Sequence, residues 1–210
     1  MTGPIRNSAR YALKRWVVRL ARMLAFAPLI AIAACSPKHP WHMTDITGAM
    51  PALEFSMTRA NDGKAVTAQD YRGKVTILYF GYTHCPDVCP TTLANLSEML
   101  HSLGHDARGV RVLFVSVDPN RDTLPVLKEY VAAFAQEIDG LRGTDNALAS
   151  LARRYRVIYS VTPRAPGHSY DVMHSNSVFF FDATGRARLV TTSTQDVKGI
   201  AEDVAHLLKS

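Results

Sequence analysis

The chain has 210 residues, 47% of them hydrophobic, and a formal net charge of +6. The six basic residues in excess all precede Met23, where no acidic residue occurs, so the rest of the chain carries 18 basic and 18 acidic residues. A neutral body argues against binding to a polyanion, and we expect no nucleic-acid partner. The length suits one domain with its own hydrophobic core.

Residues 1–34 have the pattern of an export leader. A basic stretch is followed by the apolar run Met23–Ala34, which is shorter than the ~20 residues that a membrane-spanning helix needs. The run ends in Ile32-Ala33-Ala34-Cys35, which resembles the lipobox of bacterial lipoproteins and implies cleavage before a lipid-modified Cys35. We therefore expect a lipid-anchored protein on the periplasmic face of a bacterial membrane, with the inner membrane favoured. An uncleaved anchor helix and an ordinary secretory leader are the alternatives.

The segment 35–52 is predicted to be a tether, because its prolines and glycine follow no helical or strand period. The folded domain is expected to span 53–210. It begins with a predicted N-terminal β-hairpin of Leu53–Thr58 and Lys64–Thr67, because the intervening Asp-Gly suits a turn with positive φ. Val75–Phe80 is a continuous β-favouring apolar run, which predicts a central strand buried on both faces.

Helical and strand patterns then follow to the C-terminus. Four leucines between Leu93 and Leu103 have helical spacing, and Val110–Val117 predicts a second buried strand. The remaining predicted elements are helices over Asp122–Gln136 and Thr144–Tyr155, a hairpin of Ser177–Asp182 and Arg186–Thr191, and a closing helix over Asp196–Lys209. This order predicts a thioredoxin-like α/β fold with a central mixed β-sheet flanked by helices.

Cys85 and Cys89 are the one cysteine pair that remains if Cys35 carries lipid. They follow the predicted central strand, at the edge where open α/β sheets place their ligands. Because Cys89 immediately precedes Pro90, we expect it to be the N-cap of the next helix, where the positive end of the dipole lowers a thiol pKa. Thiolates prefer soft metals such as Cu(I) or Zn(II), but two of them leave either metal short of ligands. A third ligand is expected elsewhere in the chain.

The histidines are the natural source of that ligand. His174 precedes the strand that begins near Ser177, and in a thioredoxin-like fold the loop before this strand faces the redox cysteines. His84 adjoins Cys85 but should point away from it, because side chains alternate along a strand. Position alone favours His174 and leaves the assignment open. The other histidines are predicted to be solvated or to lie on loops: His39, His42, His101, His105, His168 and His206.

The segment Phe80-Gly-Tyr-Thr-His-Cys-Pro-Asp-Val-Cys-Pro90 resembles the signature of the SCO/SenC family of thioredoxin-fold copper chaperones for cytochrome c oxidase. The segments 116–123 and 170–175 agree with this resemblance, which runs from about Leu53 to the C-terminus. It implies that Cys85, Cys89 and His174 bind copper, as Cu(I), Cu(II) or both. Asp118 and Asp122 match family positions, and we interpret them as structural, at a strand end and near a helix N-terminus.

The implied partner is cytochrome c oxidase subunit II, together with other periplasmic copper chaperones or thiol oxidoreductases. The family carries copper to the binuclear CuA site of subunit II, or reduces the cysteines of that site so that copper can enter. A pure thiol/disulfide oxidoreductase is the main alternative, because a cysteine pair at a helix start already suffices for exchange. A peroxidase is disfavoured by the absence of its motif, and a structural disulfide by the very short loop it would close.

Overall fold

Val75–Gly81 (β4) is the strand on which the core is built, and all seven of its residues are buried. The computed structural model describes residues 40–162 and 170–210. The predicted leader, Cys35, His39 and His168 therefore lie outside the described residues. The described part from Trp41 onward is one compact unit, in which the predicted central strand is confirmed.

The elements of the described residues follow one another as strands and helices, with two short 3₁₀ turns at Ala68–Tyr71 and Gly104–Gly109. The strands are β1 (Thr44–Asp45), β2 (Ser56–Arg59), β3 (Ala65–Thr67), β4, β5 (Val110–Ser116), β6 (Ile138–Arg142), β7 (Tyr159–Thr162), β8 (Asp171–His174), β9 (Val178–Phe181) and β10 (Ala187–Thr191). The helices are α2 (Val88–Leu103), α3 (Leu124–Ala132), α4 (Asp145–Arg154) and α5 (Val197–Leu207).

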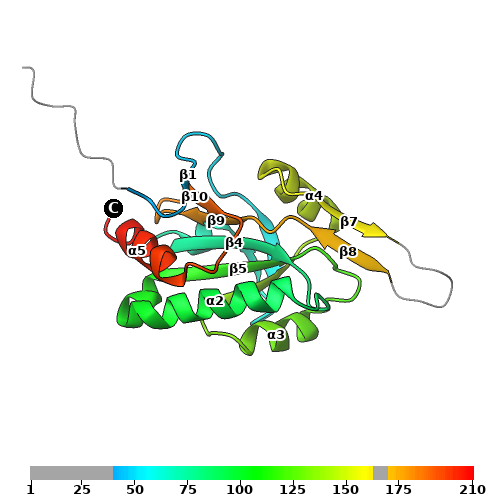
Figure 1. The fold of residues 1–210 in the computed structure, drawn as a ribbon. Helices are drawn as coiled ribbons and strands as arrows, with labels where there is room; N and C mark the ends of the chain where they lie inside the picture. The colour runs from blue at the N-terminus through cyan, green and yellow to red at the C-terminus, as the bar shows by residue number, and fades with distance from the viewer. Residues whose placement is uncertain (1–39, 163–169) are drawn as a thin grey trace, which may run out of the picture. The chain divides into compact units, whose positions relative to one another are not determined.

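The main sheet of the described residues has eight strands in the order β1-β10-β9-β4-β5-β6-β2-β3. β4, β5 and β6 run parallel to one another. β9 joins β4 antiparallel on one side, and the β2–β3 hairpin joins β6 antiparallel on the other. The predicted mixed sheet and N-terminal hairpin are confirmed. Figure 1 shows β4 and β5 near the middle of this sheet, with β7 and β8 as a separate ribbon.

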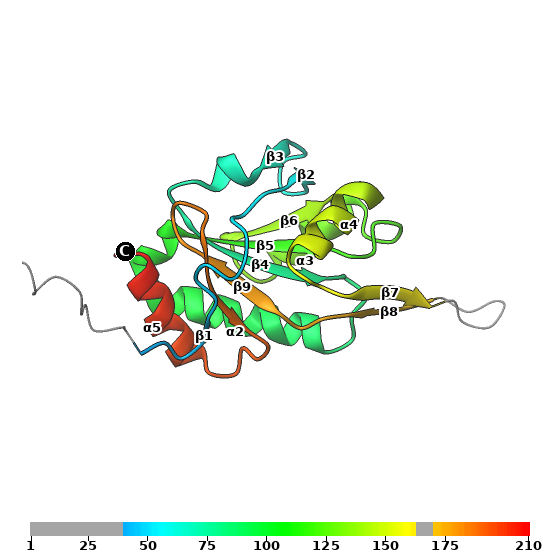
Figure 2. The same cartoon turned by 90° about the horizontal axis from the view of Figure 1, so that it is seen from above.

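Two helices pack side by side, α2 and α5, as Figures 1 and 2 show. Leu93, Leu96 and Leu100 of α2 are buried at the predicted helical spacing. In α5, Ile200 and Val204 are buried and the Asp196 side chain accepts the Gly199 N–H at the helix start. These apolar stripes supply the free energy that fixes both helices against the rest of the fold.

One predicted helix is shorter than expected, because an unpredicted strand follows it. α3 begins after Thr123, whose side chain accepts the Val126 N–H, and it ends at Ala132 instead of Gln136. The chain then forms β6, which pairs parallel with β5. β6 contains the buried Asp139, which accepts a hydrogen bond of 3.0 Å from the Tyr71 hydroxyl. A carboxylate inside a strand interrupts the apolar run, so the sequence pattern did not predict this strand.

The ribbon of β7 and β8 was also not predicted. Its strands pair antiparallel, with Tyr159 opposite His174. Ile158 and Met173 are exposed large hydrophobic residues at this ribbon. His174 consequently lies at the end of a strand and not in the expected loop before Ser177. A two-stranded ribbon outside the main sheet carries no long buried run by which sequence alone would identify it.

The start of the described chain is held against α5. The backbone N–H groups of His42 and Met43 donate to the Asp203 carboxylate, which is fully buried. β1 then pairs with β10, so a short strand lies inside the segment that was predicted to be a tether. Among residues 40–162 and 170–210, no helix combines the length and apolar character needed to cross a membrane.

Candidate metal centre

The cysteine pair lies between the end of β4 and the first turn of α2. Cys85 is 8% exposed and Cys89 is fully buried. Asp87 occupies the N-cap position of α2, so Cys89 is inside the helix and the prediction that it caps the helix was wrong. Proline is tolerated across the first turn, because the N–H groups there lack intrahelical partners. Pro90 therefore indicates where the first turn of α2 lies, but it does not indicate which residue begins the helix.

A backbone N–H group at the start of α2 donates a hydrogen bond to the sulfur of Cys85 and not to that of Cys89. The Cys89 N–H donates to Cys85 Sγ across 3.4 Å. Burial raises the pKa of the Cys89 thiol to about 12, although hydrogen bonds from the Tyr82 backbone and the Tyr79 hydroxyl act in the opposite direction. The predicted low pKa of Cys89 was therefore wrong, because desolvation outweighs the helix dipole at a fully buried sulfur. A metal that binds Cys89 has to displace its proton.

His174 faces the buried sulfur. Its Nε2 lies 3.2 Å from Cys89 Sγ, and its Nδ1 lies 3.0 Å from the carbonyl oxygen of Ser175. A carbonyl only accepts, so Nδ1 carries the proton and the Nε2 lone pair points toward the cysteines. Burial lowers the pKa of His174, which keeps the imidazole neutral and able to bind a metal. A histidine that ligates a metal commonly makes this kind of second hydrogen bond.

The ligand atoms of Cys85, Cys89 and His174 all lie within 4.8 Å of one another. Gly81 at the end of β4 leaves the room that this arrangement needs. A Cβ added to Gly81 would lie 2.9 Å from Cys89 Sγ and 2.5 Å from Phe114. Two sulfurs and one imidazole nitrogen are the donors that suit Cu(I) or Zn(II). The residues present therefore fit the copper ion that the family resemblance implies.

The remaining described histidines lie outside this cluster. His84 is exposed and its Nδ1 is 3.0 Å from the Thr83 hydroxyl, in keeping with the prediction that it points away. His42 is exposed and its Nε2 is 2.9 Å from Glu202. His101, His105 and His206 are exposed, as expected. None of these belongs to the group of ligand atoms found among the described residues.

A polar network at the base of the ribbon was not predicted. Arg121 forms an ion pair with the buried Asp118, and its guanidinium lies 4.0 Å from the centre of the Tyr170 ring. The Tyr170 hydroxyl donates to Asp118. Arg121 thereby connects the loop after β5 to the residue that precedes β8. All three residues lie in the segments 116–123 and 170–175 that carried the family resemblance, which is the signal that points to them.

Asp122 lies near the start of α3, as predicted, although Thr123 is the residue that caps this helix. Its carboxylate is fully buried and accepts hydrogen bonds from the Thr83 hydroxyl at 2.6 Å and the Ser116 hydroxyl at 2.6 Å. Asp122 therefore fixes the loop that precedes Cys85 to the end of β5. This role is structural, as predicted, and Asp122 performs it through contacts with residues distant in the sequence.

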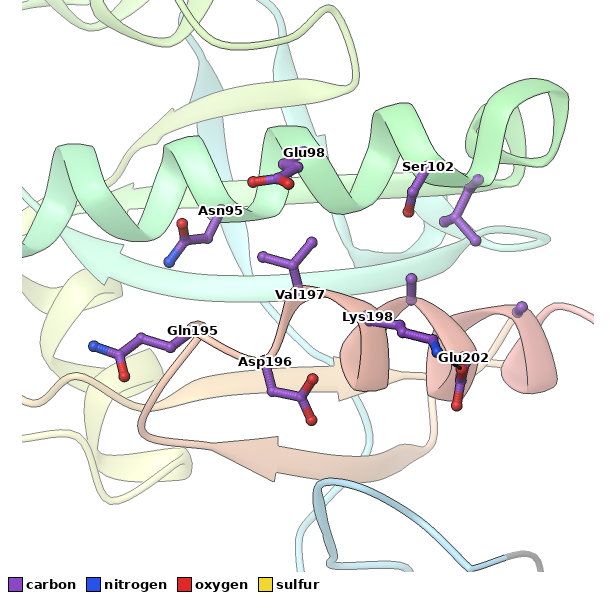
Figure 3. Close-up of a pocket in the computed structure, with 11 residues that line it drawn as sticks. Asn95, Glu98, Ser102, Gln195, Asp196, Val197, Lys198 and Glu202 are labelled. Carbon is purple, nitrogen blue, oxygen red and sulfur yellow. Dashed lines mark ion pairs between the residues drawn. The ribbon is translucent and has the colours of Figure 1, made fainter.

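A groove between α2 and α5 holds none of these residues. Figure 3 shows Asn95, Glu98 and Ser102 of α2 across from Gln195–Lys198 and Glu202. Seven of its eleven lining residues are polar or charged. The candidate chemistry therefore lies at the start of α2 and not in this groove.

A thioredoxin-like sheet that presents two cysteines at a helix start, with a histidine facing them from a ribbon, defines a thiol-based metal-binding or redox protein. The model of the SCO1/SenC family matches residues 47–209. The chain belongs to this family.

The most similar proteins include two curated relatives. SCO2 of Saccharomyces cerevisiae, a mitochondrial protein, is 41% identical over 128 residues, which cover 60% of this chain and 42% of the relative. The mitochondrial SCO1 homolog 1 of Arabidopsis thaliana is 45% identical over 123 residues, which cover 58% of this chain and 36% of the relative. The matched part is thus less than half the length of either relative.

A solved structure agrees over nearly its whole length. ScoI of Bradyrhizobium japonicum with copper bound is 37% identical, with a TM-score of 0.69, over 75% of this chain and 99% of that one. This similarity confirms the predicted thioredoxin-like fold.

The comparisons contradict the predicted location on the periplasmic face of a bacterial membrane. The two curated relatives are named as mitochondrial proteins. The prediction rested on the leader pattern of residues 1–34 and on the lipobox resemblance that ends at Cys35, and all of these residues lie outside the described part of the chain.

Proposed function

We propose that the protein is a copper-binding metallochaperone that assists assembly of the CuA site of cytochrome c oxidase subunit II. Cys85, Cys89 and His174 hold the copper. The observation that carries this proposal is the convergence of two sulfurs and one imidazole nitrogen within 4.8 Å. Membership of the SCO1/SenC family and the copper-bound ScoI structure support it.

The donor set suits a carried metal. Two thiolates and one imidazole satisfy the coordination of Cu(I), whereas other metals demand further ligands. The sulfurs are screened from water, since Cys89 is fully buried and Cys85 nearly so. Cys85, the more exposed of the two, is the ligand that an acceptor thiol reaches first. Copper is then the cargo of the protein, which subunit II receives from it.

A second candidate function is reduction of the disulfide formed by the CuA-site cysteines. It is favoured by the free thiols of Cys85 and Cys89, which lie next to each other at a helix start. In this reaction both thiols are oxidised to a disulfide while the partner disulfide is reduced to two thiols. His174 has no necessary role in the exchange, and this difference separates the two functions.

The test is a Cu(I) titration of the reduced protein against a competing chelator. We expect one Cu(I) per chain, and we expect His174→Ala to weaken its binding at least ~10-fold without unfolding the protein. His84→Ala is the matched control, because His84 adjoins Cys85 but is exposed. Unchanged Cu(I) affinity in His174→Ala would overturn the three-ligand site.

The same protein is assayed for reduction of a disulfide in the CuA domain of subunit II. A copper carrier loads the reduced domain and reduces the oxidised domain slowly. A reductase does the opposite and is insensitive to His174→Ala. The two assays together decide which function the cysteine pair serves.

The unit that carries this function is the predicted domain 53–210, with β1 as an added edge strand. The pairing of β1 with β10 and the contact of Asp203 with Met43 support a start near residue 41. A chain that begins at residue 41 is expected to bind Cu(I) like the full chain, whereas one that begins at 53 is expected to be less stable. Equal stability of the two, measured by urea unfolding, would contradict the contribution of β1.

A further inference from the structure

The buried sulfur of Cys89 lies between two polar side chains. His174 Nε2 is 3.2 Å from it, and the hydroxyl of Tyr79 donates to it across 3.6 Å. Tyr79 is in the middle of β4 and is fully buried, so water does not compete for its hydroxyl. Cys85 Sγ accepts the backbone N–H of Cys89. Cys89 also has a hydrogen bond from the Tyr82 backbone, so the Tyr79 hydroxyl is a side-chain donor in addition to a backbone donor.

A hydrogen bond to a metal-bound sulfur changes the reduction potential of the metal. A phenol is protonated at neutral pH and donates, and a metal-bound thiolate can only accept. A hydrogen bond to an ionised acceptor is roughly twice as strong as one between neutral groups. It draws electron density away from the metal–sulfur bond, and hydrogen bonding around a copper-bound cysteine sulfur tunes the reduction potential.

We propose that Tyr79 is a positioning residue of the metal centre, whose hydroxyl holds the Cys89 sulfur and weakens its donation to copper, so that Cu(I) is favoured over Cu(II). This inference rests on the proposed copper-binding function. It concerns the oxidation state in which the cargo is held, which depends on Tyr79 and not only on the three ligands.

The ring of Tyr79 also packs in the core, so the test has to remove the oxygen alone. Its centroid is 5.9 Å from that of Phe114 and 6.0 Å from that of His174. Tyr79→Phe keeps these ring contacts. Tyr130→Phe is the matched control, because the Tyr130 ring also packs against Phe114, with the ring centroids 5.5 Å apart. The Tyr130 hydroxyl is buried without a hydrogen-bond partner in the described part of the chain.

The experiment compares the full chain with these two variants. Each is titrated with Cu(II), and the sulfur-to-copper charge-transfer band and the Cu(II)/Cu(I) potential are measured. We expect Tyr79→Phe to bind one copper, to shift the band to longer wavelength and to lower the potential, because the thiolate donates more strongly without its hydrogen bond. Tyr130→Phe is expected to match the unmodified chain. An unshifted Tyr79→Phe, or equal shifts in both variants, would overturn the proposal.

Two further measurements keep the outcome decisive. Replacement of all tyrosines by 3-fluorotyrosine makes the phenol a stronger donor, and the band should then move to shorter wavelength even if Tyr79→Phe fails to fold. No shift, or a shift to longer wavelength, counts against Tyr79.

If the unmodified chain binds no copper, the proposed function fails by itself. The role of Tyr79 is then tested through the reduction potential of the metal-free Cys85–Cys89 disulfide. This potential should become more negative in Tyr79→Phe, because the reduced Cys89 loses its hydrogen-bond donor. An unchanged potential there would reject the role of Tyr79.

Discussion

The three converging side chains come from two regions of opposite character. Cys85 and Cys89 follow β4, a strand with every residue buried, and Cys89 lies in the first turn of a helix that packs on the core. His174 belongs to the β7–β8 ribbon, whose strands pair with each other and not with the main sheet. Next to it, Met173 is 69% exposed. The difference teaches that stability depends mainly on the core region, whereas the proposed metal binding needs both regions.

Core substitution in β4 should give the largest loss of stability. Leu78 is fully buried, so Leu78→Ala is expected to lower the free energy of unfolding by about 2–5 kcal/mol, through lost burial and the cavity left behind. Met173→Ala on the ribbon should change it by no more than about 0.5 kcal/mol, because its side chain is already in water. Urea unfolding monitored by circular dichroism measures both, and equal losses would remove the contrast between the regions.

Gly81→Ala should affect both stability and the metal centre. The added methyl group would press on Phe114 and on the Cys89 sulfur, at a cost of about 1–3 kcal/mol of unfolding free energy. We also expect weaker Cu(I) binding, since the sulfur has to move. Gly109→Ala is the control, because its methyl group would meet only the end of the Leu208 side chain, far along the chain from the cysteines. Competition with a Cu(I) chelator tests this, and an affinity equal to that of Gly109→Ala would show that the sulfur has room.

Arg121→Met should act on the ribbon more than on the core. It removes the ion pair to Asp118 and the stacking on Tyr170, and the expected cost is about 1–2 kcal/mol because Arg121 is partly exposed. We expect Cu(I) affinity to fall because His174 is held less firmly, whereas the thiol pair stays reactive toward a disulfide. Arg153→Met, on the exposed side of α4, is the control. Undiminished Cu(I) affinity would mean that the ribbon positions His174 without this network.

The smallest effect is a pH dependence from the turn between β9 and β10. Burial alone would raise the pKa of Asp182, but hydrogen bonds from Thr184 and Arg186 outweigh it, and the pKa is lowered in the folded protein. A lowered carboxyl pKa stabilises the fold above the unfolded value of about 3.9, and this stability is lost as pH falls through the lower folded value. Asp182→Asn should therefore flatten the decline in unfolding free energy as the pH falls below that value. An unchanged profile would place the acid sensitivity elsewhere.

The sequence by itself determined the elements that have a continuous local signal. The apolar runs at 75–80 and 110–117 predicted the central strands, and the leucine spacing after Pro90 predicted the long helix. The segment 80–90 also identified Cys85 and Cys89 as the chemical centre. The predictions of these strands and of this helix succeeded because burial on both faces of a strand, or on one face of a helix, leaves a periodic pattern in the residues themselves.

The tertiary structure decided what depends on contacts between distant residues. β6 pairs with β5, and its buried Asp139 accepts a hydrogen bond from the distant Tyr71 hydroxyl. Arg121 and Tyr170 contact each other at the base of the ribbon that carries His174. His174 meets Cys89 across 85 positions of sequence, a distance that no local pattern spans. The raised pKa of Cys89 follows from its burial, which a motif does not specify. The sequence thus determined which residues were candidates for the site, and packing determined that they converge and what environment they have.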